Sequence, residues 1–82
     1  MNKPYITFHL SEASEALDKL LKDMGSDPEY EYGDYRVDME HLYHHINSAW
    51  NAREASEKAA SDCSEEDFRR WRQFPTDLQL LD

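Results

Sequence analysis

The 82-residue sequence contains a single cysteine, two glycines and three prolines. One cysteine, Cys63, cannot form a disulfide within the chain and is typical of a reducing compartment. No segment approaches the roughly 20 apolar residues that cross a bilayer, and the first ten residues lack the apolar core of a signal peptide. We therefore expect a cytoplasmic protein.

Basic residues are also scarce. Nine lysines and arginines stand against 18 aspartates and glutamates, which gives a formal charge of -9. Such a charge repels phosphate backbones and anionic membrane surfaces, so neither direct nucleic-acid binding nor membrane binding is expected. The simplest interpretation of the charge is a solvated face that keeps a small protein soluble.

Apolar residues make up only 39% of the chain. A domain of this length buries about 60 to 65% of the surface that its unfolded chain exposes, so its core is small. Small domains gain support from disulfides, metals, self-association or very regular helix packing. With an internal disulfide excluded, a metal, self-association or regular packing is left, and of these we expect self-association as a homodimer.

The first helix is predicted from residue 11 to residue 24. Ser11 has the side chain of a helix N-cap, and Gly25 is placed to end the helix. Apolar residues recur at spacings of three and four, which predicts one apolar stripe. The stripe consists of Leu10, Ala13, Leu17, Leu20, Leu21 and Met24. The residues before Ser11 are expected to be extended.

The connection that follows is predicted to be a loop with one helical turn. Asp27 followed by Pro28 can begin such a turn. The tyrosines on either side of Gly33 could instead form a β-hairpin, but an isolated two-stranded hairpin is only marginally stable in water. The loop is therefore the favoured interpretation.

A second helix is predicted from Asp34 to an end between Arg53 and Ala55. At about 100° per residue, its apolar side chains and Arg53 form one band. The band consists of Tyr35, Met39, Leu42, Tyr43, Ile46, Ala49, Trp50 and Arg53. His41 and His45 lie near the back of this band. They would form a second, more polar contact face if the helix is central in a bundle.

The last helix is predicted to start after Ser64 and to end before Pro75. Ser64 is its N-cap, with Asp67 as the capping-box acid. Cys63 and Phe68 are spaced as a hydrophobic staple, which explains the cysteine without any reactivity. Nearby carboxylates also oppose the formation of a reactive thiolate.

Together these elements predict an all-α fold: a small three-helix bundle within one acidic domain over residues 1–82. Residues 56–62 add a short helical turn or a link. The chain is expected to begin with an extended N-terminus and to end with an apolar C-terminal tail. In that tail, Leu78, Leu80 and Leu81 either pack on the bundle or stay exposed.

The stretch from Glu40 to Trp50 contains three histidines. His41 and His45 are four residues apart, and Asp38 lies one turn earlier on nearly the same face. These three residues predict a zinc or nickel site as an alternative function, with a metalloenzyme as one form of it. The sequence lacks the H-E-x-x-H order, and only His9 could add a ligand from outside this helix. A packed or solvated helix is therefore favoured.

An acidic, tyrosine-rich segment follows the first helix. Its members are Glu29, Tyr30, Glu31, Tyr32 and Asp34. Carboxylates beside rigid tyrosine rings could bind a basic protein partner, for instance by imitating the phosphate charge of a nucleic acid.

The sequence favours a non-enzymatic binding or regulatory module that self-associates. The predicted partner-binding residues are Tyr43, Trp50, Arg53 and Trp71, because interface cores favour aromatic and guanidinium side chains. A small-molecule site between protomers is compatible with the aromatic content, but no residue pattern favours it.

Overall fold

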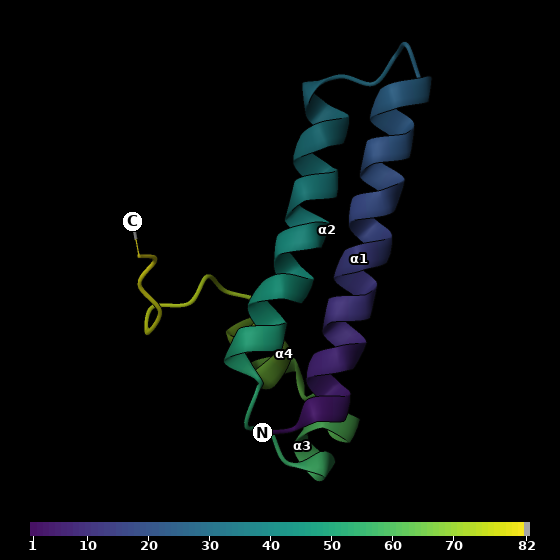
Figure 1. Ribbon diagram of the computed structural model, residues 1–82. Helices are drawn as coiled ribbons and strands as arrows, with labels where there is room; N and C mark the ends of the chain where they lie inside the picture. Colours follow the sequence, from purple (N-terminus) through teal and green to yellow (C-terminus); the bar gives the residue numbers. More distant parts are fainter. Residues whose placement is uncertain (82) are drawn as a thin grey trace.

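Two long antiparallel helices form the body of the protein in a computed structural model, which describes residues 1–81 (Figure 1). Helix α1 spans Lys3–Ser26 and α2 spans Tyr32–Asn51. Two short helices, α3 (Glu57–Asp62) and α4 (Glu65–Trp71), follow near the end of the hairpin where α1 begins. The described residues contain no strand, and the predicted all-α fold is confirmed.

Helix α1 begins well before Ser11, so the predicted extended N-terminus is wrong. The side-chain oxygen of Asn2 accepts a hydrogen bond from the backbone N–H of Tyr5 at 3.1 Å, and Pro4 occupies the first turn. Asparagine at the N-cap and proline in the first turn are a strong start signal. Ser11 lies on the exposed side of the continuous helix.

The start of α1 is also joined to the turn after α2. Asn2 donates its backbone N–H to the Arg53 carbonyl at 2.7 Å and its side-chain amide to the Ala55 carbonyl at 2.9 Å. Helix α2 ends at Asn51, slightly before the predicted end. These bonds hold the chain in a turn at that point.

The loop between α1 and α2 is short and contains no hairpin of strands. The Asp27 carboxylate accepts the backbone N–H of Glu29 at 2.9 Å as the chain leaves α1. Glu31 is the N-cap of α2, and its backbone N–H donates to the Asp34 carboxylate at 3.1 Å. Because this cap is complete, α2 begins at Tyr32, just before the predicted start at Asp34.

Serine side chains begin both short helices. The Ser56 hydroxyl accepts the backbone N–H of Ala59 at 3.0 Å, and the Ser64 hydroxyl accepts that of Asp67 at 3.1 Å. The N-cap predicted at Ser64 is confirmed. The Asp67 carboxylate pairs with the Arg70 guanidinium at 2.7 Å.

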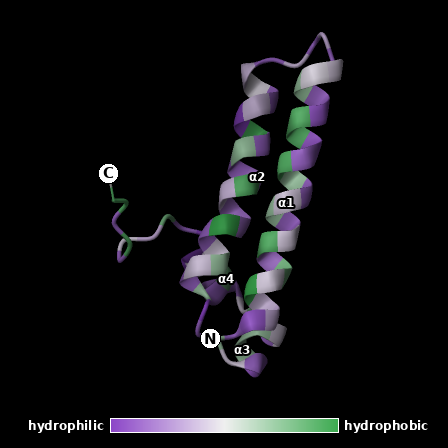
Figure 2. Cartoon of the chain, in the orientation of Figure 1, coloured by the Kyte–Doolittle hydropathy of each residue, from purple (hydrophilic) through white to green (hydrophobic). Residues whose placement is uncertain are grey.

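The core is narrow. Hydrophobic residues occur along both long helices (Figure 2), but few are enclosed. The buried apolar residues of the described chain are Ala13, Leu20, Ala49, Ala52 and Trp71. Alanines let helices approach closely, although each removes little apolar surface from water. The buried polar residues are His9, His45, Asn47 and Ser48.

Helix α2 turns its histidine side toward α1. His45 is buried against His9, and Ala52 is buried on the same side. Tyr43 and Ile46 of the apolar band remain exposed. The polar contact face expected from the sequence is therefore the face that meets α1, and the apolar band lies to the side.

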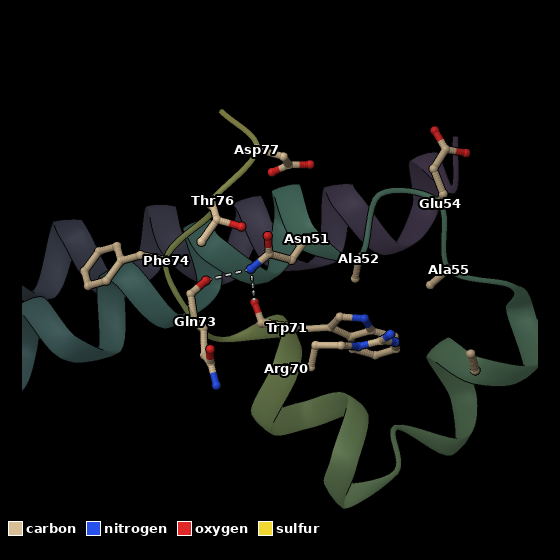
Figure 3. Close-up of a pocket in the computed structure, with 11 residues that line it drawn as sticks. Asn51, Ala52, Glu54, Ala55, Arg70, Trp71, Gln73, Phe74, Thr76 and Asp77 are labelled. Carbon is tan, nitrogen blue, oxygen red and sulfur yellow. Dashed lines mark hydrogen bonds between the residues drawn. The ribbon is translucent and has the colours of Figure 1, made fainter. Parts of the chain in front are cut away.

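Two asparagines of α2 hold the end of α4. Asn47 donates its side-chain amide to the Arg72 carbonyl at 3.1 Å. Asn51 donates to the carbonyls of Trp71 and Gln73 at 2.8 and 2.6 Å (Figure 3). Side-chain donors thus satisfy carbonyl groups that a helix leaves free at its C-terminus.

Replacing Asn51 by alanine should lower the free energy of unfolding by about 1 to 3 kcal/mol, because two carbonyl groups at the end of α4 lose their donor. Urea unfolding followed by circular dichroism measures the change. Gln79→Ala, at an exposed position of the tail, is the control and should change the free energy by less than about 0.5 kcal/mol. Equal stability of the two variants would show that these bonds do not hold α4.

Candidate functional site

Four histidines gather where α1 meets α2. The Nδ1 atoms of His9 and His45 are 3.1 Å apart, and the Nε2 atoms of His45 and His41 are 3.2 Å apart. The ring of His44 lies 4.5 Å from that of His45, measured between ring centres. We refer to His9, His41, His44 and His45 as the histidine cluster. It occupies part of the helix contact where large apolar side chains would be expected.

Three of these rings form a chain of hydrogen bonds from the surface to the interior. His41 is exposed, whereas His45 and His9 are buried. A neutral imidazole has one N–H, so the middle ring donates through one nitrogen and accepts through the other. The chain can therefore pass a proton between the exposed ring of His41 and the buried ring of His9.

Burial keeps the inner histidines neutral. Burial, followed by the neighbouring His45, lowers the pKa of His9. Burial, followed by His41, lowers the pKa of His45. Burial, followed by repulsion from His45 and Arg72, lowers the pKa of His44 to about 4. At neutral pH the hydrogen bond between His9 and His45 therefore joins uncharged rings.

Of the three residues predicted as metal ligands, Asp38 does not join the two histidines. The Asp38 carboxylate accepts a hydrogen bond from the Tyr30 hydroxyl at 2.7 Å, while His41 and His45 bond to each other. Within residues 1–81, no three histidine, cysteine or carboxylate side chains are grouped so that they could hold a metal ion. The zinc or nickel alternative at Asp38, His41 and His45 thus has no ligand set in this structure.

The acidic, tyrosine-rich segment is partly structural. Glu31 and Asp34 form the cap of α2, and Tyr30 donates to a carboxylate of that helix. Partial burial and this hydrogen bond raise the pKa of Tyr30 to about 12. Glu29 and Tyr32 are exposed near the tip of the hairpin.

Three of the predicted partner-binding residues contact the C-terminal segment of their own chain. Trp50 donates its indole N–H to the Asp77 carboxylate at 2.9 Å. The Arg53 guanidinium lies 4.0 Å from the Trp50 ring centre and pairs with Asp77 at 3.4 Å. Tyr43 packs edge-on against Phe74, with ring centres 5.1 Å apart. The chain after α4 is therefore attached to α2.

The fourth predicted partner-binding residue lies in the core. Trp71 is only 5% exposed, and its ring centre is 5.8 Å from that of Tyr5. A residue that contacts a partner must be accessible, so we assign Trp71 to the packing of α4. In the tail, Leu78 is half exposed and Leu80 and Leu81 are almost fully exposed.

The chain has a pocket on each side of Trp71. One, of about 560 Å³, lies between α2, α4 and the C-terminal segment (Figure 3). Its lining includes the charged residues Glu54, Arg70 and Asp77. The other, of about 490 Å³, lies where all four helices meet. We refer to it as the histidine pocket, and its walls include Tyr5, Phe8, His9, His44, Phe68 and Trp71.

No family model, no curated protein and no solved structure matches this chain. Among the helices of residues 1–81, none combines the length and the apolar character needed to cross a bilayer.

Acidification should destabilise the fold between about pH 6.5 and pH 4. Because the pKa values of His9, His44 and His45 are lowered in the folded chain, the unfolded chain binds protons first as the pH falls. The stabilisation is complete above pH 6.5 and is lost as the pH falls toward the folded-state pKa values. For the partly exposed His44, we expect a loss of about 1 kcal/mol at pH 5 after allowing for solvent screening.

Urea unfolding at several pH values in this range measures the effect. The double variant His44→Asn with His45→Gln removes two titrating rings, so its stability should depend less on pH, whatever its stability at pH 7. The same pH dependence in the variant and the wild type would assign the acid sensitivity to carboxylates.

Proposed function

We propose that the protein is a self-associating interaction module in which two copies pack the open side of the α1–α2 hairpin against each other. The observation that supports this proposal is the amount of apolar surface left uncovered on that side. A small domain with a thin core gains stability when a second copy covers such a surface.

Both long helices carry exposed apolar side chains. On α1, Leu20 of the predicted stripe is buried, but Leu21 is 58% exposed. On α2, Ile46 is 43% exposed. At 100° per residue, the exposed residues of the two helices point to the same side of the antiparallel pair. We refer to this set as the hairpin face, which consists of Leu10, Leu17, Leu21, Met24, Tyr35 and Ile46.

The hairpin face lies away from α4. Helix α4 is attached through Asn47 and Asn51, which lie on a different side of α2 from Ile46. In Figure 1, α4 lies behind the lower part of α2, and in the same orientation Figure 2 shows hydrophobic residues along both long helices. Within residues 1–81, the members of the hairpin face are all exposed.

The chain exposes more surface than a folded monomer of its mass. Its accessible surface is 6479 Å², whereas the scaling for monomeric proteins gives about 5,100 Å² for 9.7 kDa. The excess of roughly 1,400 Å² is larger than the ~800 Å² that each partner buries in a standard interface. A dimer that covers the hairpin face would bring the exposed surface close to the normal range.

A second copy is the occupant whose shape fits this face. Leu10, Leu17 and Met24 are spaced by seven residues, the repeat found where helices pack along their length. Two hairpins joined by a two-fold axis would form a four-helix bundle, in which the same face of each chain meets its copy. Each chain carries a charge of -9, so added salt should strengthen the dimer.

Ile46→Glu should weaken dimerisation at least tenfold, because it places a charge in an apolar interface. Val37→Glu is the matched control. Val37 is a β-branched residue of the same helix and is 64% exposed, but it lies on the opposite side of α2. Sedimentation equilibrium measures the monomer–dimer constant, and thermal unfolding shows whether each variant is folded.

The control variant should dimerise like the wild type. A wild-type chain that remains monomeric at about 100 µM, well above the dissociation constant of a stable dimer, would contradict the proposal. Equal dimerisation of the two variants would also contradict it, because the interface would then lie elsewhere.

A further inference from the structure

The charges of the chain are divided unevenly between the two ends of the α1–α2 hairpin. We refer to residues 23–38, which include the loop between the helices, as the acidic tip (Figure 1). The charged side chains of the acidic tip are Asp23, Asp27, Glu29, Glu31, Asp34, Arg36 and Asp38. Six carboxylates and one guanidinium give it a charge of -5, more than half of the -9 that the whole chain carries.

The other end of the hairpin has the opposite balance. We refer to residues 1–11 and 42–53 as the base of the hairpin. Apart from histidines, the only charged side chains of the base are Lys3 and Arg53. Arg53 pairs with a carboxylate of the C-terminal segment, whereas Lys3 is exposed. At 100° per residue, Lys3 lies on the same side of α1 as Leu10, so the hairpin face has an acidic end and a basic end.

Two arrangements with a two-fold axis bury the hairpin face in a four-helix bundle. In the first, the two acidic tips lie together, and α1 packs against α2 of the copy. In the second, the hairpins point in opposite directions, and α1 packs against α1 of the copy. The first arrangement places two charges of -5 side by side. The second places each acidic tip beside the basic end of the other chain, which electrostatics favours.

The spacing of the apolar residues on α1 also favours opposite directions. Leu10, Leu17 and Met24 form a row with Leu17 at its centre and equal steps on both sides. When two such rows run in opposite directions, Leu10 of each chain meets Met24 of the copy, and Leu17 meets Leu17. On α2, the exposed members of the hairpin face, Tyr35 and Ile46, do not repeat at this spacing.

We infer that the two copies pack in opposite directions, with α1 against α1 and each acidic tip beside the base of the other chain. This inference rests on the proposed self-association and adds to it the direction of the partner. The basic surface that meets the acidic, tyrosine-rich segment is then the end of a second copy that carries Lys3.

Disulfide cross-linking in a glutathione buffer tests the arrangement. The background is Cys63→Gly, which removes the native thiol and suits the φ of 41° at this position. Leu17→Cys should form a cross-linked dimer by itself, because the two copies of this residue meet at the two-fold axis. Lys19→Cys is the matched control. Lys19 is exposed on the opposite side of α1, so its thiols should stay beyond the ~7 Å between Cα atoms that a disulfide spans.

Mixtures of two variants distinguish the two arrangements. Leu10→Cys mixed with Met24→Cys should give a cross-linked heterodimer, whereas Leu10→Cys mixed with Ile46→Cys should not. Because His9 contacts His45, Leu10 and Ile46 lie at the same level of the hairpin. They would meet across the interface only if the two tips lay together. Electrophoresis without reductant, followed by mass spectrometry, measures which pairs form.

A pair of charge reversals provides an independent measurement. Lys3→Glu and Lys22→Glu change the net charge equally, but Lys3 lies at the base and Lys22 lies next to the acidic tip, and both are exposed. In about 20 mM salt, Lys3→Glu should weaken the dimer roughly threefold more than Lys22→Glu, because it adds a carboxylate opposite the acidic tip of the copy. Sedimentation equilibrium measures both constants. The reverse order would show that the tips are adjacent and would overturn the inference.

The cross-linking results separate this inference from the proposed self-association. A cross-link between Leu10→Cys and Ile46→Cys, or no cross-link by Leu17→Cys in a chain that still dimerises, would overturn the opposite directions and leave self-association in place. A chain that does not dimerise would contradict both. Adding Ile46→Glu should suppress the Leu17→Cys cross-link. A cross-link that persists would come from chance collisions, and this too would overturn the inference.

Discussion

Helices α1 and α2 meet through small side chains and a pair of hydrogen-bonded imidazoles. Ala13 and Ala49 allow a close approach, and the rings of His9 and His45 lie between the helices. Such a contact fixes the register of the two helices by hydrogen bonds, but it removes little apolar surface from water. Most of the large apolar side chains therefore remain on the flanks of the hairpin.

The two sides of the α1–α2 hairpin differ in their side chains and in how far they are covered. One flank is the hairpin face, whose aliphatic residues are suited to a second copy of the chain. The other is covered at one end by α3 and α4, which enclose an aromatic pocket against the histidine cluster. Trp71 and the asparagine contacts hold α4, which supplies part of the pocket wall, against α2.

Local signals in the sequence predicted most of the helices but not their orientation. The cap at Ser64 and the stripe on α1 depend on neighbouring residues, so they could be predicted. Asn2 with a proline in the first turn is an equally local signal, and it marks the true start of α1. Periodicity predicted two contact faces on α2, the apolar band and the histidine side, but it did not decide which of them meets α1. The histidine pocket combines residues from all four helices, and no local pattern reveals such a site.

The hydrogen bonds between three imidazoles couple the position of the proton on His41 to that on His9. Each neutral ring carries one proton, so the hydrogen bonds from His41 through His45 to His9 can run in only two directions. Reversing one bond requires reversing the other, and the three rings therefore change tautomer as a unit. Whatever fixes the proton on the outer nitrogen of His41 also decides whether the inner nitrogen of His9 donates or accepts. A change in the proton position on the exposed His41 would thus switch the inner nitrogen of His9 between donor and acceptor without any movement of the helices.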